Sequence, residues 1–102
     1  MAIEFTQYIL PNGRKKLIKI DRGPAYDKKA SALRKAKCRF EAEILRTGEV
    51  SFTCEQEESD GNWLTLSIEV VPNGPGIPEA VDRLIDNALK KLKEGVGRER
   101  LV

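Results

Sequence analysis

The stretch 38–71 constrains the fold most, because apolar and polar residues alternate along it in three consecutive runs. Side chains of a β-strand point alternately to the two faces of a sheet, so a period of two indicates strands with one buried face. The sequence therefore predicts three consecutive antiparallel strands that share a buried face. The residues predicted on that face are Phe40, Ala42, Ile44, Val50, Phe52, Cys54, Leu64, Leu66, Ile68 and Val70.

Turn chemistry predicts how the first two of these strands pair. Matching their apolar faces places Ile44 opposite Val50, which leaves residues 46–48 as a three-residue connection. A type I turn followed by a glycine in the left-handed region is a favoured hairpin of this length, and Gly48 occupies that last position. A slip of one residue would separate the apolar residues onto opposite faces.

A second hairpin is predicted at the start of the chain. Residues 3–10 alternate in the same way, and the Asn12-Gly13 dipeptide is the strongest two-residue hairpin signal because both positions need a positive φ. A turn centred on this dipeptide pairs Phe5 with Ile20. Apolar residues of both strands then share one face.

Gln7 is the polar exception on the apolar face of this hairpin, where the predicted pairing places it opposite Ile18. Buried amides are normally hydrogen-bonded, so one interpretation is an amide that finds partners within the core. The other interpretation is that Gln7 belongs to a binding site. The sequence leaves both open.

Two helices complete the predicted fold. Pro24 suits a first helical position, and residues 25–37 follow with a thin apolar stripe and many basic residues. Pro78 opens a second helix, in which the apolar residues between 81 and 92 keep helical spacing without a gap. The order ββαβββα predicts an α+β fold: a five-stranded, largely antiparallel sheet with both helices packed on one face. The pattern does not say which edge of the three-stranded unit the first hairpin joins.

Length and composition indicate the domain organisation. A chain of 102 residues is long enough for one core. We predict a single domain over residues 1–95 and a flexible charged tail over residues 96–102. No apolar run is long enough to span a bilayer, and the N-terminus lacks a basic start and reaches Glu4 too early for a signal peptide. We therefore expect a cytoplasmic protein without a membrane partner.

Catalytic and metal-binding chemistry is poorly represented. The chain has no histidine, which removes the commonest general acid–base and metal ligand and excludes the triads that need one. Cys38 and Cys54 are predicted to be small buried residues, because their diagonal placement is poor for a disulfide. Paired carboxylates such as Glu41 and Glu43 fall on predicted solvent faces. We predict no enzymatic activity, no catalytic residue, no metal, no cofactor and no small-molecule substrate.

Charge is distributed unevenly along the chain. Residues 1–39 contain eleven Lys/Arg and three Asp/Glu, whereas residues 40–102 contain seven and thirteen, for net charges of +8 and −6. If the first hairpin and first helix lie side by side, their basic residues form a patch able to contact phosphates or an acidic partner. The candidate residues are Arg14, Lys15, Lys16, Lys19, Arg22, Lys28, Lys29, Arg34 and Lys35. A solvated face is the ordinary alternative, and few aromatic residues are nearby to stack on bases.

Several short motifs, spread over about residues 3–92, are similar to motifs in other proteins. They are IEFTQY at 3–8, PNGRK at 11–15, IDR at 20–22, RFE at 39–41, TGEVS at 47–51, VPNGP at 71–75 and PEAVDRLI at 78–85. In these motifs the chain resembles a group of short uncharacterised proteins from bacterial and prophage genomes. The resemblance implies no activity, but it favours a small phage-type protein that binds host machinery.

These observations predict a binding protein rather than an enzyme. The partner is expected to be another protein or a second copy of the chain. Nucleic-acid binding through residues 14–37 is the alternative. Residues 25–94 are similar in element order to a double-stranded-RNA-binding domain, but residues 78–83, where such domains have a lysine cluster, are mostly acidic here. The RNA-binding residues of that family therefore do not carry over.

Overall fold

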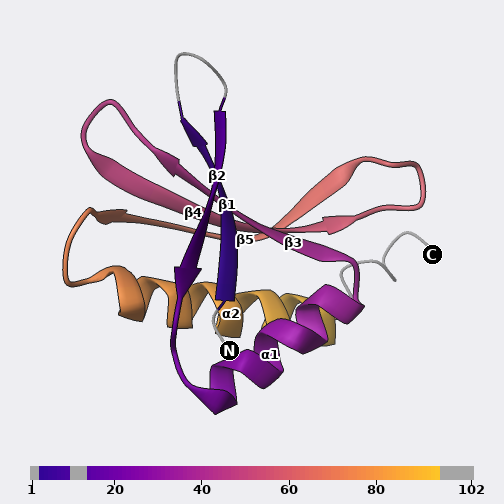
Figure 1. Cartoon of the computed structure of the whole chain (residues 1–102). Coiled ribbons are helices and arrows are strands. Elements are labelled where there is room, and N and C mark those ends of the chain that lie inside the picture. Colours follow the sequence, from indigo (N-terminus) through magenta and orange to yellow (C-terminus); the bar gives the residue numbers. More distant parts are fainter. Residues whose placement is uncertain (1–2, 10–13, 95–102) are drawn as a thin grey trace.

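The computed structural model describes residues 3–9 and 14–94 of the chain (Figure 1). Within this part the elements follow the predicted order ββαβββα, so the α+β fold class is confirmed. They are β1 (Ile3–Ile9), β2 (Arg14–Ile20), α1 (Pro24–Lys35), β3 (Cys38–Ile44), β4 (Glu49–Glu57), β5 (Trp63–Pro72) and α2 (Ile77–Lys93). The predicted turn at Asn12-Gly13 and the predicted tail over residues 96–102 lie outside the described residues.

The strands of the described part form one sheet in the order β2-β1-β3-β4-β5, and both helices lie on the same face of it (Figure 1). The first hairpin therefore joins the β3 edge of the three-stranded unit. Its strand β1 runs parallel to β3, whereas the other neighbouring pairs are antiparallel. A parallel neighbour needs a long crossover connection, and β2 and α1 supply it.

Strand register agrees with the prediction in one hairpin and differs in the other. In β3–β4 the predicted pairing is present throughout, and Gly48 adopts a positive φ of 89° at the end of the connection. In β1–β2, Phe5 pairs with Ile18 and Gln7 with Lys16, so the predicted pairing is wrong by two residues. A two-residue slip leaves every side chain on its original face, and the hydrophobic pattern therefore cannot detect it.

A β-bulge interrupts β5. Its register with β4 shifts between Cys54 and Glu55. Ser67 and Thr65 pair with these consecutive residues of β4, so Leu66 between them is an extra residue without a partner. An extra residue in one strand turns the side chains that follow it to the opposite face.

The bulge overturns the predicted burial of two residues. Ile68 and Val70 lie on the face away from the helices, where they are 56% and 49% exposed. Ser67 faces the helices instead, and its buried hydroxyl donates a 2.7 Å hydrogen bond to the carbonyl oxygen of Leu84 in α2. Leu66, before the reversal, is buried as predicted.

The core lies between the sheet and the helices. At its centre the Phe5 ring lies 5.6 Å from the ring of Phe40 and 5.1 Å from that of Phe52. Tilted and edge-to-face contacts of this kind are the favoured arrangements of aromatic pairs. Ile44 faces the same side but is 50% exposed, contrary to the prediction, because it ends β3 beside a pocket that opens to solvent.

The two helices differ in how much apolar surface they contribute. α2 has the continuous buried stripe that its spacing predicts, with Leu84 at its middle. α1 has a narrower stripe, whose largest buried member is Leu33. It starts at Pro24 as predicted and ends at Lys35, followed by Lys37 with a positive φ of 64°. In the described part of the chain, neither helix has the length and apolar character needed to cross a membrane.

Cys38 and Cys54 lie in the core as free, buried thiols, in agreement with the sequence. A hydrogen bond with Cys38 and burial both raise the pKa of the Cys54 thiol. Because the thiolate is the reactive form of cysteine, Cys54 is suited to packing and not to nucleophilic chemistry.

Candidate functional site

The basic residues predicted to form a patch are divided between the hairpin and α1. Arg14, Lys15 and Lys16 begin β2, at the end of the hairpin that lies far from α1 (Figure 1). Lys19 lies nearer the helix, on the face of the sheet away from the helices, with its amine 3.8 Å from the Glu4 carboxylate. The fold therefore separates the basic residues at the start of β2 from the basic residues of α1.

Two members of the predicted set connect the α1 segment to α2. The Arg22 guanidinium donates two hydrogen bonds to the Asp82 carboxylate, one of them 2.7 Å long. The Lys29 amine donates a 2.8 Å hydrogen bond to Asp86. These hydrogen bonds raise the pKa of Arg22 and of Lys29. Both cations are already paired within the protein, which leaves less of their charge for a partner.

The remaining members lie on the outer side of α1. Lys28 and Lys35 are exposed and flank a shallow depression with Ser31 between them. The guanidinium of Arg34 lies 5.4 Å from the centre of the Phe40 ring, within range of a cation–π interaction. On α1, the two exposed lysines are thus the best placed of the set to meet a partner.

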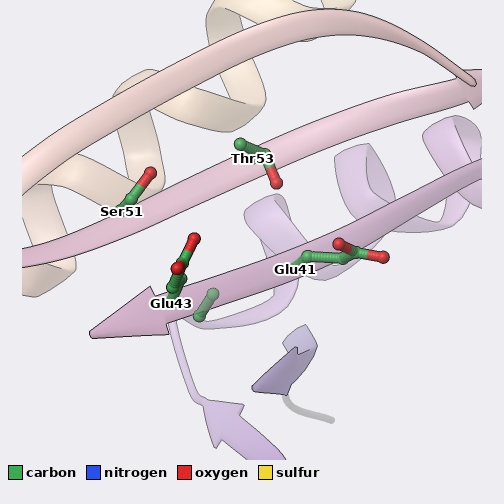
Figure 2. A pocket seen from close by; sticks show the side chains of 5 residues that line it. Glu41, Glu43, Ser51 and Thr53 are labelled. Atoms are coloured by element: carbon green, nitrogen blue, oxygen red, sulfur yellow. The ribbon is translucent and has the colours of Figure 1, made fainter. Parts of the chain in front are cut away.

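We call the side of the sheet opposite the helices the open face. Figure 2 shows its centre, where side chains of β3 and β4 project away from the helices. The residues of β3, β4 and β5 on the open face include Arg39, Glu41, Glu43, Ser51, Thr53, Glu55, Trp63, Thr65, Ile68 and Val70.

Arg39 joins several charges of the open face. Its Nε lies 3.0 Å from a carboxylate oxygen of Glu41 and 3.0 Å from one of Glu55, and its guanidinium lies 3.8 Å from the centre of the Trp63 ring. Stacking and two charged contacts hold this side chain in one orientation. Glu43, farther along β3, is exposed. Two carboxylates contact the one guanidinium and Glu43 adds a third negative charge farther along β3, so this region is acidic.

Exposed apolar side chains lie next to these charges. Ile68 and Val70 of β5 stand opposite Thr53 and Ser51 of β4, and the Trp63 side chain is also partly exposed. An unbroken period of two places Ile68 and Val70 on the buried face, so this apolar strip is not predicted from the alternation alone. The available signal was the pair of adjacent apolar residues at 70–71, which already departs from strict alternation.

A small hollow lies on the open face between β3 and β4 (Figure 2). Its volume is about 60 Å³, far below the roughly 300–1,000 Å³ of typical ligand pockets. The Glu43 side chain points towards β4, whereas the carboxylate of Glu41 extends along β3, away from Glu43 (Figure 2). Within residues 3–9 and 14–94, no three acidic or cysteine side chains are grouped so that they could hold a metal ion. This hollow suits contact with another surface better than catalysis on a small substrate.

Comparisons of the chain with protein-family models, curated proteins and solved structures gave no match. Function therefore has to be inferred from the side chains that the fold exposes and from the charges that it pairs. By that criterion the open face is the strongest candidate, since it combines an apolar strip with an ordered acidic cluster.

Proposed function

We propose that this protein is a small non-enzymatic binding protein whose open face docks onto a basic surface of a partner protein. The observation that carries the proposal is the β-bulge at Leu66. It directs two β-branched apolar side chains, Ile68 and Val70, to the exposed side of the sheet and directs Ser67 into the core. Bulges are common near functional sites because they redirect side chains in this way.

The stability of the isolated chain does not favour this arrangement. Full burial of a Val or Ile side chain contributes about 1.5–3 kcal/mol, and Ile68 and Val70 forgo much of that contribution while they are exposed. A partner that covers them would restore it. Exposed apolar residues bordered by polar groups are typical of interaction sites.

The charges of the open face favour a partner that carries lysine or arginine. Glu55 lies on the strand next to the apolar strip, and Glu41 and Glu43 lie one strand farther away on the same face. Arg39 balances only part of their charge. A second copy that presented the same face would bring like charges together, which costs free energy. A basic protein surface would meet complementary charge instead.

Two further observations support a non-enzymatic role in a bacterial setting. The chain has no histidine, so its general acid–base chemistry would have to depend on less suitable groups. The resemblance to short bacterial and prophage proteins suggests that the partner is a protein of the bacterial host.

The proposal is tested with Trp63, the single tryptophan of the chain. Basic proteins that the tagged chain captures from a bacterial lysate are purified and titrated while Trp63 fluorescence is recorded. Because Trp63 lies on the open face, a docked partner should change its emission. We expect Ile68→Asn/Val70→Asn to weaken binding by about tenfold or more through faster dissociation, and Glu43→Lys to slow association.

The matched control is Lys28→Glu/Lys35→Glu on the outer side of α1, which should bind as tightly as the wild type. Unchanged binding by both open-face variants, or loss of binding in the α1 variant alone, would contradict docking at the open face. A rise in the mass of the pure chain at low salt, measured by light scattering, would indicate self-association instead.

Nucleic-acid binding is the second candidate function, and the exposed Lys28 and Lys35 on α1 favour it. Binding through phosphates should weaken steeply with salt. In a gel-shift assay we expect Lys28→Glu/Lys35→Glu to reduce the shift of a mixed DNA and RNA set. The absence of any shift at low salt would exclude this candidate.

A further inference from the structure

An apolar pocket lies on the helix side of the sheet, between the first hairpin and the start of α2. Its volume is about 270 Å³. Its walls include Ile18, Ile20, Ile44, Phe52 and Ile77, which come from β2, β3, β4 and the first turn of α2. The half-exposed Ile44 marks its opening. The pocket is on the opposite side of the sheet from the open face and is independent of the docking proposed above.

Gln7 supplies a polar group inside this pocket. It lies on β1 among apolar neighbours and is only 7% exposed. Its side-chain amide makes no hydrogen bond to any residue that the structure describes. Because the amide lines the pocket, it is free to bond to water or to a ligand there. Of the two interpretations that the sequence left open, the structure favours a site over an amide satisfied within the core.

The remaining polar lining restricts the chemistry of a ligand. Asn73 contributes a second side-chain amide at the rim, and the described lining contains no charged residue. Against these apolar walls a carboxylate or ammonium group would lose much of its hydration, which costs free energy. A glutamine amide both donates and accepts, so a neutral ligand amide can form two hydrogen bonds with it.

We propose that the apolar pocket binds a small neutral molecule that has one apolar ring and a carboxamide or lactam edge, with that edge paired to Gln7. The size is consistent with the volume, since an engineered apolar cavity of about 150 Å³ holds benzene. The present pocket, at about 270 Å³, has room for a substituted ring. The isoleucines and Phe52 would contact the ring, and the amide would replace the missing partner of Gln7.

The test uses benzamide and toluene as matched probes in an NMR titration of the ¹⁵N-labelled chain. Both probes carry the same ring, but only benzamide offers an amide. We expect benzamide to shift the Gln7 side-chain NH₂ signal together with the backbone signals of Ile18 and Ile77. Toluene, which cannot bond to the amide, should shift the backbone signals and move the Gln7 side-chain signal less than benzamide does.

Variants separate the role of Gln7 from that of the apolar walls. Gln7→Leu should weaken benzamide binding roughly tenfold, the effect of losing a typical hydrogen bond, without weakening toluene binding. Ile44→Trp places a large ring at the half-exposed opening and should block the binding of both probes. This variant tests the pocket even if Gln7→Leu does not fold. Ile68→Thr on the open face is the control and should retain both. Absence of benzamide shifts, or equal benzamide affinity in wild type and Gln7→Leu, would overturn the proposal.

Discussion

The two faces of the sheet are made by the same five strands, yet they differ in what their apolar residues do. On the helix side, Phe5 and Phe52 are buried in an aromatic cluster between the sheet and the helices. On the open face, Ile68 and Val70 remain about half exposed beside Thr53 and Ser51. A residue's position in an alternating run therefore indicates which face of the sheet it occupies only where no bulge interrupts the strand register.

A thiol-labelling experiment should give the largest difference between the faces. Cys54 is fully buried on the helix side, and its pKa is raised by a hydrogen bond with Cys38 and by burial, of which burial alone remains when Cys38 is replaced. In a Cys38→Ala background, we expect Cys54 to react with a thiol reagent only through unfolding. Its labelling should therefore be about a thousandfold slower than that of the denatured chain, or slower still.

The matched variant for this measurement carries Thr53→Cys on the open face, in a chain whose native cysteines are both replaced by alanine. Thr53 adjoins Cys54 in β4 but points to the other side. It should label far faster than Cys54, although partial burial and the acidic neighbours keep it slower than a free thiol at neutral pH. Similar rates for the two positions would contradict the assignment of faces in β4.

Phe52→Ala is expected to give the largest loss of stability. Its ring is 2% exposed and packs edge-on against Phe5, so truncation leaves a cavity that the core cannot fill. The free energy of unfolding should fall by about 3–5 kcal/mol, measured by urea denaturation. Thr53→Ala, the next residue on the opposite face, should cost less than about 1 kcal/mol. Equal losses would mean that the two faces are not differently packed.

Ser67→Ala should have an intermediate effect. The serine hydroxyl is buried and bonded to the carbonyl oxygen of Leu84. That bond ties β5 to α2, and we expect its removal to lower the free energy of unfolding by about 1 kcal/mol. An unbroken alternation would instead place Ser67 in solvent, where the substitution would be neutral. Urea denaturation distinguishes these outcomes.

Ile68→Thr should have the smallest effect of the series. Threonine keeps the β-branched shape that suits a strand, and the side chain lies on the open face. The change in free energy of unfolding should stay within about 0.5 kcal/mol. A loss above about 2 kcal/mol would indicate a buried isoleucine and would contradict the bulge.

Much of the fold could be predicted from the sequence, but less of the candidate sites could, and particular residues show why. The β3–β4 pairing was predictable because a short connection ending in Gly48 allows few registers. The β1–β2 pairing was not, because a slip of two residues preserves the face of every side chain. The pairing of Arg22 and Lys29 with acidic residues of α2 was also not predictable, since it joins segments about 60 residues apart whose approach depends on helix packing.

By itself, the sequence determined the elements, their order and the helix side of most strands, because side-chain periodicity and turn residues act over short distances. The tertiary structure alone decided that β1 lies beside β3, that Leu66 is accommodated as a bulge, and that Gln7 lines a pocket. Each of these depends on which strands and helices meet. Many arrangements of strands and helices are compatible with the same local pattern. Packing and hydrogen bonding in the assembled core determine which of these arrangements forms.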